Sequence, residues 1–185
     1  MSTKIIRQYR VILMDLPYFG LTGQFVDNLS SYCRSAALVK SLLDALDITH
    51  VHIAGNSLGG AVAWNFAGNY PEMTESLLLI DAVPPILERR SFGLLTEPWL
   101  AGILSQFTPR FLIKRLLRTA YGDPTKLTDD SVHIILRKEG TRKAILTTKP
   151  EPVSDAELLS VLENVTAPTF IIWGEEDTWI PIVAL

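Results

Sequence analysis

The sequence has 185 residues, 48% of them hydrophobic, 20% charged and 9% aromatic, which predicts a packed globular domain and excludes a disordered tail, a collagen-like repeat and a disulfide scaffold. Its 17 Lys and Arg against 20 Asp and Glu give a net charge of −3, so there is no overall positive field to hold a nucleic-acid backbone. The single cysteine, Cys33, cannot form an internal disulfide, and no Cys and His cluster near it supplies ligands for a structural zinc ion.

The first ten residues, Met1 to Arg10, are polar and basic, and no apolar core of the signal-peptide type follows them. No run of 18 apolar residues occurs anywhere in the sequence. We therefore expect no integral membrane segment and a cytoplasmic location.

Short apolar runs alternate with segments of helical periodicity at both ends of the chain. Strands are predicted for Val11–Leu16, Val51–Ala54, Ser76–Ile80 and Thr169–Trp173, and helices for Tyr32–Leu46, Leu58–Asn69 and Ala156–Leu162. This alternation is typical of an α/β fold with a mostly parallel sheet. We expect the strands to be buried, with helices on both faces of the sheet.

Residues 86–146 show helical periodicity without predicted strands, which indicates a helical insertion. The insertion divides the chain into a first core segment over 1–85, the insertion itself, and a return to the core over 147–185. It carries 11 basic and 6 acidic residues. This local excess of positive charge is explained either by the solvated outer face of amphipathic helices or by a site that attracts an anionic substrate or a membrane surface.

The most informative motif is Gly55-Asn56-Ser57-Leu58-Gly59, a Gly-x-Ser-x-Gly sequence between a predicted strand and a predicted helix. A sharp turn there would strain the serine backbone, and we expect Gly55 and Gly59 to provide the space that the turn needs. Ser57 would then stand at a helix N-terminus, and the backbone N–H of Leu58 would be a natural oxyanion donor. The alternative is an ordinary glycine-rich turn.

Several segments together resemble the α/β-hydrolase fold family, in its branch with a helical cap. Besides Gly55 to Gly60, they are the loop Asp15 to Gly23, the strand Leu77 to Asp81, and the segment Trp173-Gly174-Glu175-Glu176-Asp177 with Pro181. The resemblance is to capped esterases, lipases and carbon–carbon bond hydrolases, and it implies that residues 86–146 form the cap. One departure is Tyr18, which stands where the family usually has glycine.

The resemblance implies a Ser-His-Asp mechanism with Ser57 as the nucleophile. Asp177 is the expected acid because it matches the Trp-Gly-x-x-Asp pattern of the family, and Asp81 is the second candidate. A solvated acidic turn over 175–177 is the alternative explanation for Asp177.

The base is missing from its family position, since none of the eight residues after Asp177 is a histidine. We expect His50 and His52 to be structural or surface residues and His133 to lie on the cap surface. The loop that carries the second oxyanion donor of the family, together with its third and last strands, is also missing. The chain is therefore expected to be truncated at both ends and to self-associate through exposed strand edges.

Two functions stay open at this point. The first is a serine hydrolase of an ester-like or acyl small molecule that needs no cofactor or metal, with the histidine outside this chain. The second is a non-catalytic binding or regulatory remnant of the same fold. In the first case five apolar residues of the insertion would line the substrate pocket, although they could equally form the cap core: Phe92, Trp99, Leu104, Phe107 and Phe111.

Overall fold

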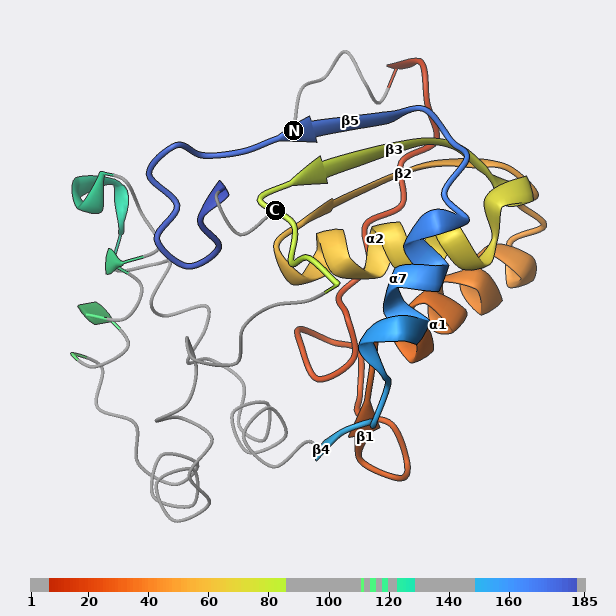
Figure 1. Ribbon diagram of the computed structural model, residues 1–185, viewed down its shortest axis with the longest axis horizontal. Coiled ribbons are helices and arrows are strands. Elements are labelled where there is room, and N and C mark those ends of the chain that lie inside the picture. The colour runs from red at the N-terminus through yellow and green to blue at the C-terminus, as the bar shows by residue number, and fades with distance from the viewer. Residues whose placement is uncertain are drawn as a thin grey trace.

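The computed structural model (Figure 1) describes residues 7–85, 111, 114–115, 118–119, 123–128 and 149–182. Most of the predicted insertion therefore lies outside the described residues. The main sheet has three parallel strands in the order β2-β3-β5. They are β2 (Val51–Asn56), β3 (Thr74–Ile80) and β5 (Thr169–Ile172).

Three helices accompany this sheet, and each lies within two residues of its predicted bounds. They are α1 (Tyr32–Ala45), α2 (Leu58–Asn69) and α7 (Asp155–Glu163). A short parallel pair outside the main sheet was not predicted: β1 (Leu29–Ser30) pairs with β4 (Lys149–Pro150). Two short 3₁₀ helices complete the described elements, η2 (Pro71–Met73) and η4 (Pro124–Lys126).

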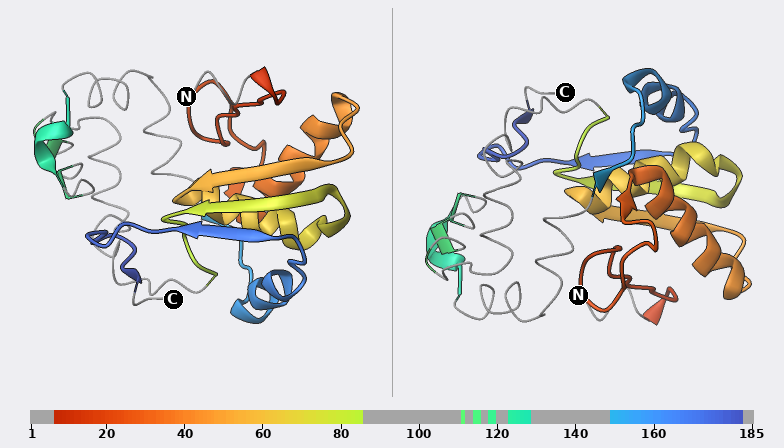
Figure 2. Two further views of the ribbon diagram at one scale, coloured as in Figure 1. Left: turned by 90° about the horizontal axis from the view of Figure 1, so that it is seen from above. Right: turned by 90° about the horizontal axis from the view of Figure 1, so that it is seen from below.

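All three helices pack on the same face of the sheet, and the strands lie in front of them when the molecule is seen from above (Figure 2, left). The expectation of helices on both faces is therefore wrong for the described residues. The order β2-β3-β5 adds each strand on the same side of the previous one, and right-handed crossovers then place their helices on one face.

The core is centred on α2, which contacts β2, β3, α1 and α7. Nine consecutive residues of this helix, from Gly60 to Gly68, are buried, and Trp64 and Phe66 are among the largest fully buried side chains. A helix that is apolar on all sides is typical of a position inside a core. Gly68 allows α7 to approach closely, because a Cβ atom there would collide with the carbonyl of Val161.

The other helices begin at serine caps. The Ser31 side chain accepts the N–H of Arg34 at the start of α1. At α7, Ser154 and Glu157 form a reciprocal capping box. The hydrogen bonds from Ser154 hold the pKa of the Glu157 carboxyl below its usual value.

The predicted strand over 11–16 is absent, and the expected burial is wrong for that segment, for β5, and for β2, whose residues alternate between half-buried and exposed. Residues 11–16 form no strand and pair with no other described segment, and Leu13 is 80% exposed. β5 is a strand, but all four of its residues are exposed, including Phe170 at 66%. An apolar run shows that a segment can be buried, whereas its actual burial requires a neighbouring element, and neither segment has one on its outer side among the described residues.

The described helices include none that is both long enough and apolar enough to cross a membrane.

Candidate active site

Ser57 lies between the end of β2 and the start of α2. The turn that joins these two elements lies at the carboxyl end of the parallel strands (Figure 1). Its φ of 51° and ψ of −118° lie in a sparsely populated region that costs a non-glycine residue about 1–3 kcal/mol. Backbone hydrogen bonds fix this conformation: the Ser57 N–H donates to the Ile80 carbonyl at 2.9 Å, and the Ser57 carbonyl accepts from Ala61 and Val83. The predicted strained serine turn is therefore present.

The two glycines of the motif are not equivalent. A Cβ atom at position 55 would collide with the backbone of Gly59 and Gly60, so Gly55 is required by the turn, as predicted. A Cβ atom at position 59 would have no described atom within 4 Å outside its own helix, so the described residues do not show the predicted need for space at Gly59. The second required glycine is Gly60, where a Cβ atom would collide with the Cβ of Ala82.

Leu58 is the first residue of α2, so its N–H has no acceptor within the helix. Among the described residues it donates no hydrogen bond, and no side chain caps this helix end. The neighbouring Asn56 side chain donates to the Ile80 carbonyl at 3.1 Å and is thereby tied to the end of β3. The Leu58 N–H, the predicted oxyanion donor, is thus available to a ligand.

Asp177 lies in the turn after β5 and is half-buried. Its Oδ1 accepts the N–H groups of Trp179 and Ile180, at 2.8 and 2.9 Å. Its own N–H donates to the Gly174 carbonyl at 3.1 Å. One carboxylate oxygen is therefore held by backbone donors, while Oδ2 makes no hydrogen bond within the described part of the chain.

Asp81, the second candidate acid, follows β3 directly and has a φ of 44°. Its Oδ1 accepts the N–H of Gly174 at 2.6 Å. Both candidate acids thus contribute to the turn that follows β5. Asp177 is part of this turn, and Asp81 bonds to its first residue, Gly174.

The described histidines lie away from the Ser57 end of β2. His50 precedes the strand, which spans about 20 Å, and its Nδ1 lies 3.0 Å from the Thr49 hydroxyl. His52 points from the strand to Ser76 at 2.8 Å and to Glu75 at 3.1 Å. Its ring also packs edge-on against Tyr9. Neither is placed to accept a proton from Ser57, and His133 lies outside the described residues.

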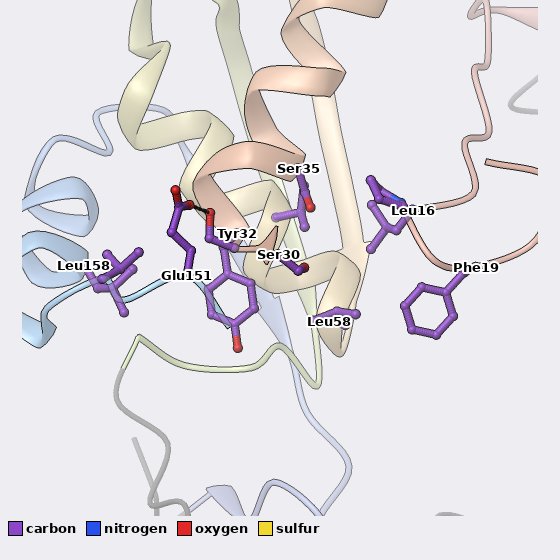
Figure 3. A pocket seen from close by; sticks show the side chains of 12 residues that line it. Leu16, Phe19, Ser30, Tyr32, Ser35, Leu58, Glu151 and Leu158 are labelled. Atoms are coloured by element: carbon purple, nitrogen blue, oxygen red, sulfur yellow. Dashed lines mark hydrogen bonds between the residues drawn. The ribbon is translucent and has the colours of Figure 1, made fainter. Parts of the chain in front are cut away.

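A cavity of about 230 Å³ lies beside Leu58, between the loop over 16–19 and the start of α1 (Figure 3). Its lining is mostly apolar, but Glu151 contributes a carboxylate whose Oε2 accepts the Ser31 hydroxyl at 2.6 Å. Sequence reasoning missed Glu151, because it is 120 residues from Ser31 and belongs to no motif. The twelve lining residues are Leu16, Pro17, Phe19, Ser30, Ser31, Tyr32, Ser35, Leu58, Val62, Glu151, Val153 and Leu158.

Of the five predicted pocket residues of the insertion, the structure describes Phe111. Phe111 is 68% exposed and is not one of its lining residues. Phe92, Trp99, Leu104 and Phe107 lie outside the described residues.

Two further side chains make hydrogen bonds that the sequence did not predict. Tyr18 has a φ of 73°, the left-handed conformation that suits the glycine usual at this place, yet it is buried and donates its hydroxyl to the Leu29 carbonyl at 3.1 Å.

Cys33 donates its thiol to Asn65 Oδ1 at 3.1 Å. Burial, with smaller contributions from Glu151 and Glu157, raises the pKa of this thiol, which disfavours the nucleophilic thiolate.

Comparison with known proteins gives one consistent result. A family model described as "Alpha/beta hydrolase family" matches residues 3–184. A 2-hydroxy-6-oxononadienedioate/2-hydroxy-6-oxononatrienedioate hydrolase from Comamonas testosteroni is 30% identical over 189 residues, covering 94% of this chain and 63% of the relative. A 2-hydroxy-6-oxo-6-phenylhexa-2,4-dienoate hydrolase from Burkholderia cepacia is 30% identical over 181 residues, with the same coverage.

Among solved structures, a meta-cleavage product hydrolase from Pseudomonas fluorescens IP01 superposes with a TM-score of 0.73 at 25% identity, covering 96% of this chain and 65% of that one. The chain thus spans about 63% of the length of the curated relatives it matches.

Proposed function

Because the chain belongs to the alpha/beta hydrolase family, we propose that it forms the central part of a serine hydrolase in which Ser57 attacks a carbonyl carbon. The observation that carries this proposal is the strained backbone of Ser57 at the junction of β2 and α2. In an ordinary glycine-rich turn the serine has no function, and there would be no reason to hold it in a conformation that raises the free energy of the folded chain.

The mechanism needs a proton acceptor, an acid that orients it, and donors for the oxyanion. As Ser57 Oγ bonds to the carbonyl carbon, its proton passes to an imidazole, and negative charge develops on the carbonyl oxygen. The Leu58 N–H at the positive end of α2 stabilises that charge. Asp177, with Oδ1 held by two N–H groups, presents Oδ2 to the imidazole.

The imidazole comes from a histidine outside these 185 residues. The placement of His50 and His52 supports this, because both occupy hydrogen bonds or ring contacts away from the elbow. The chain's coverage of about 63% of its relatives leaves room for such a histidine in a longer protein.

The substrate is a small carbonyl compound, either an ester or a ketone. Both offer a trigonal carbon to Ser57. In both, the bond from that carbon to the leaving group breaks when the tetrahedral intermediate collapses, and the leaving oxygen or carbon takes the proton held by the imidazolium. Water then hydrolyses the acyl ester on Ser57. The names of the two relatives specify 6-oxo dienoates, which favours a ketone whose carbon–carbon bond is hydrolysed. The lipase-like and esterase-like alternative takes an ester.

Active-site labelling tests this proposal. A fluorophosphonate should label Ser57 rapidly in a form of the chain extended by its flanking coding sequence, and Ser57→Ala should abolish the label. Asp177→Asn should slow labelling by orders of magnitude, whereas Asp81→Asn should not. Loss of labelling in Asp81→Asn with Asp177→Asn unaffected would make Asp81 the acid.

The second candidate function, a non-catalytic binding remnant, is favoured by the position of the two described histidines. It predicts no covalent label on Ser57 in either the given chain or the extended form. Rapid Ser57-dependent labelling of the given chain would contradict both candidates as stated and would make His133 the first residue to test as the base.

A further inference from the structure

Asp81 lies where the carboxyl ends of three strands are joined by hydrogen bonds. The residue before it, Ile80, accepts the N–H of Ser57 through its carbonyl at 2.9 Å. The N–H of Asp81 itself donates to the Ile172 carbonyl at the end of β5, at 3.0 Å. Asp81 therefore connects the turn of Ser57 on one side with the start of the Asp177 turn on the other.

The side chain of Asp81 adds a link that the backbone cannot supply. Its Oδ1 accepts the N–H of Gly174 at 2.6 Å, across 93 residues of sequence. A charged acceptor makes a stronger hydrogen bond to an amide than a neutral one does. This bond fixes the first residue of the turn that carries Asp177.

From Gly174 the hydrogen bonds continue to Asp177. The Gly174 carbonyl accepts the N–H of Asp177 at 3.1 Å, and Asp177 Oδ1 accepts the N–H groups of Trp179 and Ile180. The Trp173 indole closes the turn by donating to the Ile180 carbonyl at 2.8 Å. The position of the Asp177 carboxylate thus depends on where Gly174 is held.

We propose that Asp81 is a positioning residue, which anchors the turn of Asp177 to the sheet edge that carries Ser57. This rests on the proposed function, in which Asp177 orients the base. A carboxylate that must point at a histidine needs its loop held to within a fraction of an ångström, and a single long-range hydrogen bond at the loop's first residue provides such an anchor.

The left-handed backbone at position 81 supplies well-matched variants. Asparagine tolerates a φ of 44° and keeps an oxygen acceptor at Oδ1. Glycine tolerates the same φ but has no acceptor. Comparison of Asp81→Asn with Asp81→Gly therefore isolates the hydrogen bond from the backbone conformation. Glu176→Gln, an exposed acid in the same turn, is the control for loss of one negative charge.

Amide hydrogen exchange, followed by NMR on the given chain, tests the proposal without any substrate. In Asp81→Gly the amides of Gly174, Trp179 and Ile180 should exchange at least about tenfold faster than in the wild type, which is the effect of losing one hydrogen bond to a charged group. In Asp81→Asn the acceleration should be clearly smaller than in Asp81→Gly, because a neutral acceptor remains. In Glu176→Gln the three amides should stay within about threefold of the wild type. Leu79, in the middle of β3, reports whether the sheet itself stays folded.

Faster exchange at Gly174 alone, with Trp179 and Ile180 unchanged, would overturn the proposal, since Asp81 would then not position Asp177. Equal acceleration of all three amides in Asp81→Asn and Asp81→Gly would overturn it as well, because the acceptor kept by asparagine would then not hold the turn.

If Asp81→Gly does not fold, the chemical shift of the Gly174 amide proton tests the proposal instead. In the wild type it should lie well downfield of an unbonded glycine amide and should move upfield in Asp81→Asn, because a neutral acceptor polarises the N–H less. A wild-type resonance at the position of an unbonded amide would contradict the proposal. None of these measurements depends on whether the chain hydrolyses anything, so the outcome is separable from that of the proposed function.

Discussion

Alanine at position 55 and alanine at position 59 should have opposite effects on stability. A Cβ atom at 55 would collide with backbone atoms of Gly59 and Gly60, which cannot rotate away as a side chain can. Relief requires the first turn of α2 to move away from β2. Overpacking of this kind costs about 1–3 kcal/mol, and a backbone collision places Gly55→Ala at the upper end of that range.

Gly59→Ala is the matched control, four residues along the same motif. A Cβ atom there meets no described atom within 4 Å, and residue 59 lies in the first turn of α2. Replacing a helical glycine by alanine gains about 0.5–1 kcal/mol, because the unfolded chain loses freedom.

Urea unfolding, followed by tryptophan fluorescence at low protein concentration, measures both variants. The midpoint should fall for Gly55→Ala and rise or stay unchanged for Gly59→Ala, with a constant m-value. A Gly55→Ala midpoint within error of the wild type, or equal losses for the two variants, would refute the account of the Ser57 turn.

Three further outcomes are expected. Among the described residues β5 pairs with β3 alone and its side chains are exposed, so the chain should associate with rising concentration in sedimentation velocity. Ile171→Lys on that strand should reduce the association, and a monodisperse monomer for the wild type at high concentration would contradict this. Cys33 should react with iodoacetamide several-fold more slowly than free cysteine at pH 8, because its pKa is raised and less thiolate is present. Glu151→Gln should speed the reaction, and equal rates for this variant and the wild type would exclude the effect of Glu151. The lowered pKa of Glu157 contributes stability that is present above the ordinary carboxyl pKa and is lost as the pH falls through the lowered value. Glu157→Gln should therefore reduce the loss of stability at acid pH, measured by urea midpoints between pH 3 and 6. An unchanged loss would show that Glu157 does not contribute to it.

Local signals predicted the site elements well. The turn of Ser57 depends on residues within a few positions of one another, so it is visible in a short stretch of sequence. The same holds for α2, whose predicted bounds match those observed.

Long-range features could not be predicted, because their partners are far apart in the chain. The Asp81 bond to Gly174 spans 93 residues, and the Glu151 bond to Ser31 spans 120. The close contact at Gly60 is with Ala82, and this partner could not be identified from the local sequence. The strand predicted for the apolar run over 11–16 is absent. An apolar sequence does not show whether a neighbouring strand is present for it to pair with.

Ser57 is proposed to be a nucleophile whose base lies outside the 185-residue chain. The most direct test of this claim is hydrolysis of a p-nitrophenyl ester and of a 2-hydroxy-6-oxo dienoate by four forms: the given chain, the chain extended at its N-terminus, the chain extended at its C-terminus, and the chain extended at both ends. A serine hydrolase that lacks its base loses on the order of 10⁴–10⁶ in kcat, so the given chain and the N-terminal extension should stay near background. The doubly extended form should hydrolyse at least one substrate, and Ser57→Ala should abolish that activity. Strong, Ser57-dependent turnover by the given 185 residues alone would contradict the claim.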